Sequence, residues 1–151
     1  MFTFSSIGSF TEEGAAMGWS LPLGVWSRRK RILVVEDSPT MAAIIANILQ
    51  AFNYDIVTVS TGHEAMEQVQ AQRPDLVLLD VLLPDTNGSI ICQRLKADPS
   101  TWDIPVIYLT SKAETTIESG RTIHSADGYL AKPVRQWELV NRVEHFLRRQ
   151  V

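Results

Sequence analysis

Short apolar runs alternate with segments of helical periodicity along most of this chain. The runs at residues 32–35 and 76–79 are wholly apolar, so neither side of these strands offers polar residues to solvent. Residues 55–59, 105–109 and 128–131 are further short runs with strand character. Buried strands that alternate with helices are typical of a parallel sheet covered on both faces. The pattern therefore predicts an α/β fold with a doubly wound, five-stranded parallel sheet and five helices.

The first predicted helix has a clear beginning and end. Ser38 is a suitable N-cap residue, Pro39 fits the first helical position, and Asn53 closes the helix. Its buried face is predicted to consist of Ile45, Ile48, Leu49 and Phe52.

Four further helices follow along the chain. Thr61 and Glu64 form a capping box at the start of the second helix, which extends to residue 72. The third covers about residues 89–96, and the fourth, at residues 113–124, is assigned by elimination because its periodicity is weak. The fifth follows Pro133, and its inner face is predicted to consist of Trp137, Val140, Val143 and Leu147.

The length of 151 residues is enough for one domain with a sizeable core. We expect residues 1–28 to be an N-terminal extension and residues 29–151 to form the domain. In the extension, acidic residues come first and a basic cluster comes last, which is the reverse of a secretory signal. A flexible leader is the favoured interpretation, since Pro22 and several glycines interrupt any amphipathic helix. The alternative is a segment that docks on a membrane surface or a partner.

Charge and cysteine content narrow the class of protein. The net charge is −3 and the pI is about 5.6, so the overall charge does not attract nucleic acid or anionic lipid. No basic recognition helix is evident, and we expect no nucleic-acid partner. The single cysteine, Cys92, excludes an intramolecular disulfide, and no apolar run reaches the roughly 20 residues of a membrane span. We therefore expect a cytoplasmic protein without a membrane span.

Polar residues stand at the ends of four predicted strands. Glu36 and Asp37 follow the first strand, Asp80 the third, Thr110 the fourth and Lys132 the fifth. The carboxyl ends of parallel strands meet at one edge of the sheet, so these groups are expected to lie together. One lysine and one divalent cation would balance the three carboxylates, and hard oxygen ligands favour Mg²⁺. The sequence therefore predicts a magnesium-dependent phosphoryl acceptor site with Asp80 as the nucleophile.

Four motifs occur in order, each at a strand end. They are ILVVEDS at 32–38, LLDVLLPD at 78–85 with Gly88, TS at 110–111 and ADGYLAKP at 126–133. In these motifs the sequence resembles the receiver domain of bacterial two-component response regulators, over about residues 29–147. The resemblance implies a flavodoxin-like strand order of 2-1-3-4-5. One departure is Glu36, where the family more often has Asp, so its carboxylate reaches farther.

The resemblance implies specific roles in metal binding. Asp37 and Asp80 would bind Mg²⁺ directly, together with the backbone carbonyl of Leu82, and Glu36 would act through water. Asp80 would receive the phosphoryl group from the phosphohistidine of a sensor histidine kinase or a phosphotransfer protein.

The resemblance also implies a set of residues that respond to the phosphoryl group. Lys132 would pair with Asp80 and then with the phosphoryl group, and Thr110 would move to bond its oxygens. Tyr129 would rotate inward behind Thr110, although a half-buried residue of an edge strand is the structural alternative. The Lys132–Pro133 bond is expected to be cis.

The expected function is that of a stand-alone response regulator that signals by phosphorylation-dependent protein–protein interaction. Only four residues follow Leu147, so we expect no output module, and the downstream protein would bind helix 4, strand 5 and helix 5. Residues 37–41 and 110–112 resemble regulators of pilus motility, with chemotaxis regulators as the other similar group. The protein is not expected to be an enzyme beyond promoting its own phosphorylation and dephosphorylation.

Two alternatives to this function remain open. The first is a Mg²⁺-dependent phosphohydrolase with an aspartate nucleophile, which also places that residue at a strand end. Such enzymes use a second carboxylate two residues later as acid and base, and here that position is Leu82. The second alternative is a receiver-like scaffold that acts without phosphate.

Overall fold

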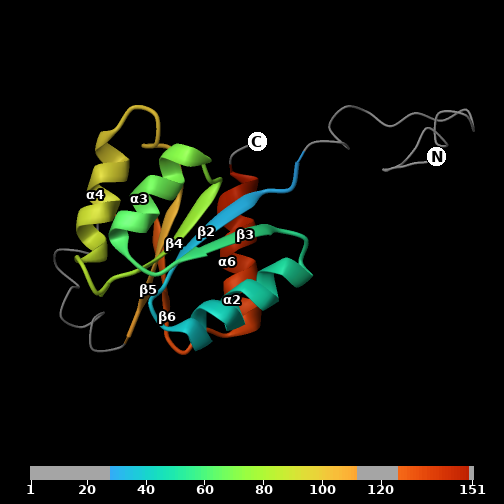
Figure 1. Cartoon of the computed structure of the whole chain (residues 1–151). Helices are drawn as coiled ribbons and strands as arrows, with labels where there is room; N and C mark the ends of the chain where they lie inside the picture. The colour runs from blue at the N-terminus through green and yellow to red at the C-terminus, as the bar shows by residue number, and fades with distance from the viewer. Residues whose placement is uncertain (1–27, 112–125, 150–151) are drawn as a thin grey trace, which may run out of the picture.

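The computed structural model describes residues 28–111 and 126–149. Five parallel strands form one sheet in the order β3-β2-β4-β5-β6, which confirms the predicted α/β fold and strand order (Figure 1). The strands are β2 (Arg31–Val35), β3 (Asp55–Val59), β4 (Leu76–Asp80), β5 (Val106–Thr110) and β6 (Gly128–Ala131). Each predicted strand lies within one residue of its observed bounds.

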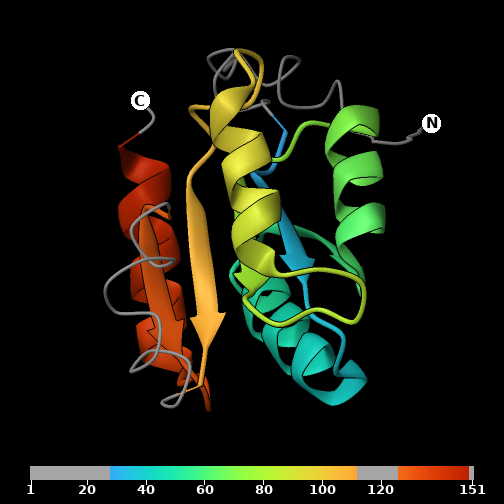
Figure 2. The same cartoon turned by 90° about the vertical axis from the view of Figure 1, so that its left-hand side faces the viewer.

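Helices cover both faces of the sheet. Within the described residues they are α2 (Pro39–Ala51), α3 (Gly62–Ala71), α4 (Gly88–Ala97) and α6 (Gln136–Arg148). The pair α3 and α4 packs on one face, and the pair α2 and α6 packs on the other (Figures 1 and 2). The helix predicted at residues 113–124 lies outside the described residues. Among the helices that are described, none is both long enough and apolar enough to cross a membrane.

The core has two layers because the central strands bury both faces. In β2, Ile32 and Val34 pack against α2 and α6, whereas Leu33 and Val35 pack against α3 and α4. All five residues of β4 and all five of β5 are buried. This explains why these strands are continuous apolar runs rather than alternating patterns.

The helix boundaries follow from local capping. Ser38 Oγ accepts a hydrogen bond from the Met41 N–H at 3.3 Å, and Asn53 takes a positive φ of 71° after the end of α2. Thr61 Oγ1 accepts from the Glu64 N–H at 3.1 Å, as predicted for the cap of α3. The Glu64 carboxylate instead accepts a hydrogen bond from the Ser60 N–H, at 3.0 Å. The second half of the capping box is therefore shifted by one residue.

Two predictions of buried helical residues are wrong. Phe52 is 44% exposed because α2 ends at Ala51 and Phe52 is its C-cap residue. Trp137 is 63% exposed, because the buried stripe of α6 is centred on Leu139 and Val143. At 3.6 residues per turn, Trp137 lies on the opposite side of the helix from Leu139.

Candidate functional site

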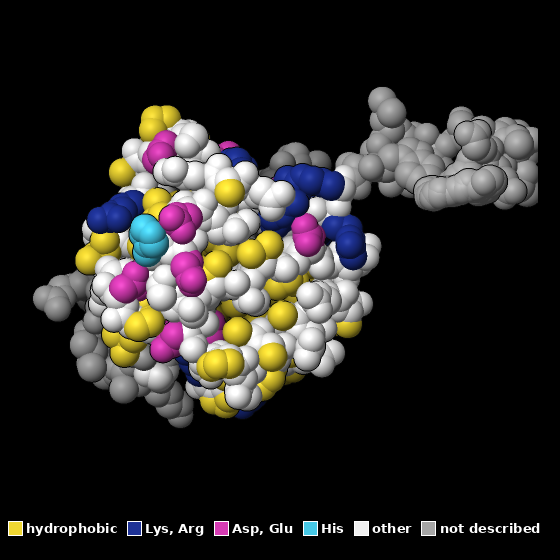
Figure 3. All heavy atoms as spheres, in the orientation of Figure 1, with side chains coloured by type: hydrophobic (Ala, Val, Ile, Leu, Met, Phe, Trp, Pro, Cys, Tyr) yellow, Lys and Arg dark blue, Asp and Glu magenta, His cyan; other side chains and the backbone are white. Residues whose placement is uncertain are grey.

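Four strands deliver polar groups to one edge of the sheet. Glu36 directly follows β2, Asp80 and Thr110 are the last residues of β4 and β5, and Lys132 directly follows β6. The arrowheads of β2 and β5 point to this edge in Figure 2. On the surface, further acidic side chains gather on the left of the molecule around α3 (Figure 3), whereas Glu36 and Asp80 themselves are buried. The structure thus brings together the residues that the sequence placed at separate strand ends.

Three carboxylates and one ammonium group form the centre of this edge. Glu36 and Asp80 are each only 3% exposed, whereas Asp37 is exposed. One oxygen from each of these three carboxylates lies within 4.8 Å of the others. Lys132 Nζ lies 2.9 Å from Glu36 Oε1 and 3.2 Å from Asp80 Oδ2. We call these four residues the carboxyl-end cluster.

Two members of the cluster, Asp80 and Lys132, have shifted pKa values. Burial is the main reason why the pKa of Asp80 rises from 3.8 to about 6, and the charge of Glu36 raises it further. The Lys132 ammonium and the Leu82 N–H act in the opposite direction. Burial lowers the pKa of Lys132, but its contacts with Glu36 and Asp80 outweigh this and raise it above its ordinary value. At neutral pH the Asp80 carboxyl group is therefore mostly ionised and Lys132 is protonated.

Glu36 has a larger structural role than the sequence suggested. Its Oε2 accepts a hydrogen bond from the Ser38 N–H at 3.1 Å, at the start of α2. Its Oε1 contacts Lys132, but this buried oxygen accepts no well-aligned hydrogen bond from the described residues. The sequence paired Lys132 with Asp80 alone, whereas Glu36 is the nearer partner. A water-mediated role of Glu36 toward a metal stays a prediction.

Of the residues predicted to respond to phosphorylation, Thr110 ends β5 next to Lys132, and Tyr129 lies within β6. Thr110 is fully buried, and its carbonyl accepts from the Lys132 N–H at 2.6 Å. The Lys132–Pro133 bond is cis, as expected. Tyr129 on β6 is 45% exposed, so its side chain is not in the inward position of the predicted switch. Its movement stays a prediction.

The loop from β4 to α4 packs tightly beneath Asp80. The Leu82 N–H donates to Asp80 Oδ1 at 3.2 Å, and the Gly88 N–H donates to the Val81 carbonyl at 2.6 Å. A Cβ atom at Gly88 would lie 2.3 Å from the Asp80 carbonyl oxygen, so only glycine allows this approach. Gly88 belongs to one of the four motifs, but the sequence did not indicate this contact.

Two residues of the same loop cap helices in ways that the sequence did not predict. Asn87 is the N-cap of α4, and its Oδ1 accepts from the Ser89 N–H at 2.8 Å. The signal was available, because Asn is a preferred N-cap residue. Asp85 accepts hydrogen bonds from the first residues of α3, and no local sequence signal joins positions so far apart.

The donor set fits a hard divalent cation. Carboxylate oxygens from Glu36, Asp37 and Asp80 converge, and Lys132 neutralises only one of their three charges. Glu36 Oε1 is buried, and among the described residues the Lys132 ammonium at 2.9 Å is near it without forming a well-aligned hydrogen bond. A cation of the Mg²⁺ type, which prefers oxygen ligands, would relieve the remaining repulsion.

The chain matches the family model of the response regulator receiver domain over residues 32–144. It therefore belongs to that family of signalling domains, which histidine kinases phosphorylate on an aspartate. No enzymatic family is indicated.

Individual relatives agree with this assignment. The chain is 40% identical over 126 residues to the DNA-binding response regulator MtrA of Mycolicibacterium smegmatis, covering 80% of this chain and 52% of MtrA. The crystal structure of a response regulator from Chloroflexus aurantiacus is 31% identical, with a TM-score of 0.75, and covers 80% of this chain and 99% of that one. The receiver domain of a Pseudomonas aeruginosa sensor histidine kinase is 27% identical with a TM-score of 0.73, covering 79% and 98% of the two chains. That structure has a magnesium ion coordinated in its active-site cleft.

The expectation that nucleic acid is excluded as a partner is wrong, because MtrA is a DNA-binding response regulator. The chain spans about half the length of MtrA. The net charge and the lack of a basic recognition helix are properties of this chain, which spans about half of MtrA, so they do not exclude a nucleic-acid partner. The geometry of the carboxyl-end cluster does not distinguish a protein partner from a nucleic-acid partner.

Proposed function

We propose that this protein receives a phosphoryl group on Asp80 from a sensor histidine kinase or a phosphotransfer protein, in a reaction that requires Mg²⁺. The observation that carries the proposal is the burial of Asp80 at the end of β4, in contact with Lys132 and close to two further carboxylates. A lone turn residue would need none of these partners. Membership of the receiver family supports the same function.

In the proposed reaction an oxygen of the ionised Asp80 carboxylate attacks the phosphorus atom of a phosphohistidine. The O–P bond forms as the N–P bond breaks, and the leaving imidazole keeps the electron pair of that bond. Bound Mg²⁺ would supply positive charge next to the phosphoryl oxygens. Lys132 contacts Asp80 at 3.2 Å, which supports a role in which its ammonium group would then pair with the phosphoryl oxygens.

The other predicted roles belong to this proposal. Asp37, Asp80 and the backbone carbonyl of Leu82 would bind the metal directly, and Glu36 would act through water. Thr110 would bond the phosphoryl oxygens, with Tyr129 following it inward.

Two forms of output are compatible with such a receiver. Residues 37–41 resemble stand-alone regulators of pilus motility, which supports signalling by protein–protein contact in the cytoplasm. The 40% identity to MtrA supports control of transcription through DNA. The domain itself would comprise residues 29–151, with residues 1–28 as an extension. Capture of proteins and of DNA fragments by the wild type and by Asp80→Asn, each treated with a phosphodonor, separates the two outputs.

Incubation with a small-molecule phosphodonor and Mg²⁺, followed by intact mass spectrometry, tests the central proposal. We expect one added phosphoryl group on the wild type and none on Asp80→Asn. Asp75→Asn is the matched control, because Asp75 is also a buried aspartate, at the other end of the sheet, and this variant should be modified like the wild type. Absence of modification in the wild type, or modification that survives Asp80→Asn, would contradict the proposal.

A further inference from the structure

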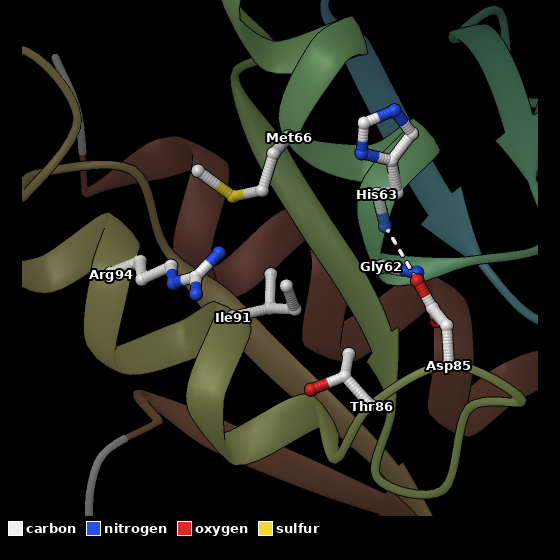
Figure 4. Close-up of a pocket in the computed structure, with 7 residues that line it drawn as sticks. All are labelled: Gly62, His63, Met66, Asp85, Thr86, Ile91 and Arg94. Atoms are coloured by element: carbon white, nitrogen blue, oxygen red, sulfur yellow. Dashed lines mark hydrogen bonds between the residues drawn. The ribbon is translucent and has the colours of Figure 1, made fainter.

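The first turn of α3 has an unusual hydrogen-bond acceptor. The first N–H groups of a helix have no partner within the helix. At α3 the Glu64 N–H is capped locally by Thr61 Oγ1 at 3.1 Å. The Gly62 N–H and the His63 N–H instead donate to the two carboxylate oxygens of Asp85, at 2.8 and 3.0 Å (Figure 4). Asp85 is thus bound to the start of a helix that precedes it by more than 20 residues.

Asp85 lies in the middle of the loop that connects Asp80 to α4. At its near end this loop is attached to the nucleophile, because the Leu82 N–H donates to Asp80 Oδ1 at 3.2 Å. Across the loop the Leu83 N–H donates to the Thr86 carbonyl at 3.1 Å, and Leu82 pairs with Asn87. The loop therefore has an inner attachment at Asp80 and an outer attachment at α3.

Close packing strengthens the outer attachment. A Cβ atom at Gly62 would lie 2.5 Å from the Thr86 methyl group and 3.0 Å from Ile91, so the loop rests directly on the first residue of α3. Beyond this contact a cavity of about 260 Å³ opens between α3 and α4, with Met66 and Arg94 on its far side (Figure 4). At this edge of the cavity, Gly62 therefore joins α3 to the loop through its hydrogen bond to Asp85 and its close approach to Thr86.

We propose that Asp85 is a positioning residue of the phosphoacceptor site, which holds the backbone of Leu82 in place by fastening the loop to α3. The part that concerns Mg²⁺ rests on the proposed function, in which the Leu82 carbonyl is a metal ligand. Asp85 itself does not contact the cluster, and it acts through the loop that it anchors. By reciprocal linkage, a metal that orders Leu82 also stabilises the hydrogen bonds from Gly62 and His63 to Asp85.

The chain contains a matched control for this proposal. Asp85→Ala and Thr61→Ala each remove a cap from the same helical turn, but only Asp85 belongs to the loop. If Asp85 served α3 alone, the two variants would have the same effect on the site. Asp85→Asn keeps one acceptor oxygen and should restore part of the function.

The test has a metal-free part and a metal-dependent part, both on the full chain. In metal-free buffer, amide hydrogen exchange by NMR should accelerate at Leu82 and Leu83 in Asp85→Ala and stay unchanged there in Thr61→Ala. In a Mg²⁺ titration followed by calorimetry, the dissociation constant should rise roughly three- to tenfold in Asp85→Ala, with an intermediate value for Asp85→Asn and little change for Thr61→Ala. Mg²⁺ should also slow exchange at Gly62 and His63 in the wild type.

Equal effects of Asp85→Ala and Thr61→Ala on Leu82 and Leu83 exchange would overturn the proposal and leave Asp85 as a helix cap. A wild-type protein that binds no Mg²⁺ would refute the metal-dependent part of the proposed function. In that case the metal-free exchange at Leu82 and Leu83 still decides the role of Asp85.

Discussion

The two ends of the sheet carry charged side chains in opposite arrangements. At the amino ends of the strands, each of four carboxylates contacts its own cation, in the pairs Arg28–Asp75, Arg31–Asp55, Arg73–Asp103 and Lys96–Asp127. In the carboxyl-end cluster, Glu36 and Asp80 both contact Lys132, and Asp37 adds a third negative charge. Charge is matched at one end and left in excess at the other.

Two buried aspartates illustrate what this difference does. Burial raises the pKa of Asp75, but the Arg28 guanidinium and the Arg31 N–H outweigh it, so the pKa lies below its ordinary value. At Asp80 burial is reinforced by Glu36, and the pKa rises to about 6. Matched charge therefore stabilises the fold, whereas the excess negative charge of the cluster costs stability and, in the proposed function, would attract a divalent cation.

Removing the cation of the cluster should have the largest effect. Lys132→Met leaves Glu36 and Asp80 buried without a positive partner, and we expect the free energy of unfolding to fall by about 3 kcal/mol in metal-free buffer. Urea denaturation at neutral pH measures this loss. Combining the change with Asp80→Asn should recover much of it. A Lys132→Met protein as stable as the wild type would show that the repulsion between the carboxylates is not significant.

Removing a negative charge from the cluster should have the opposite sign. Asp80→Asn is expected to raise the free energy of unfolding by about 2 kcal/mol at pH values above about 7 without metal, because an upward pKa shift of roughly two units destabilises the folded state. Chemical denaturation of both proteins checks this gain. A loss of stability in Asp80→Asn would contradict the assignment of excess charge.

The pH dependence provides a second readout of the same group. The folded-state pKa of Asp80 is about 6 and its ordinary value is 3.8, so the folded state binds more protons between these values. The contribution of Asp80 to stability is therefore fully present below about pH 4 and is lost as the pH rises through about 6. The stability difference between the wild type and Asp80→Asn should shrink on acidification over this range. A difference that does not change with pH would place the cause elsewhere.

At the amino ends of the strands, the same kind of substitution should be destabilising. Asp75 Oδ2 accepts from Arg28 at 2.8 Å and from the Arg31 N–H at 2.7 Å. We expect Asp75→Asn to lower the free energy of unfolding by about 1.5 kcal/mol, because hydrogen bonds to a charged acceptor are lost. Because the pKa of Asp75 is lowered, its stabilisation is present above about pH 4 and disappears as the pH falls below that. Stabilisation by Asp75→Asn would remove the contrast between the two ends.

The smallest effect is expected at an exposed matched pair. Arg73 Nη2 lies 2.6 Å from Asp103 Oδ1, but both side chains are about half exposed. We expect Arg73→Ala to lower the free energy of unfolding by about 0.5 kcal/mol, an effect that salt should reduce. Denaturation at low and high ionic strength tests this. A loss of stability as large as that caused by Asp75→Asn would mean that solvent exposure does not reduce the contribution of this ion pair.

Much of the fold was predictable because it depends on local pattern. Wholly apolar runs marked the buried strands, and Ser38, Pro39 and Thr61 marked helix starts, so most bounds agree within one or two residues. The strand-end positions of Glu36, Asp80, Thr110 and Lys132 followed from the same pattern. Phe52 and Trp137 were wrongly predicted to be buried. The position of a helix end, and the face that a helix buries, depend on what packs against that helix.

The sequence alone determined which chemical groups this protein brings to one edge of its sheet, because parallel strands must end there together. Only the tertiary structure decided how those groups pair. Lys132 lies nearer to Glu36 than to Asp80, and Asp85 caps α3 across a long sequence separation. Such contacts depend on distances between elements that are remote along the chain, and no local residue pattern encodes them. The residues of the carboxyl-end cluster were therefore predictable from the sequence, whereas the distances and contacts between them were not.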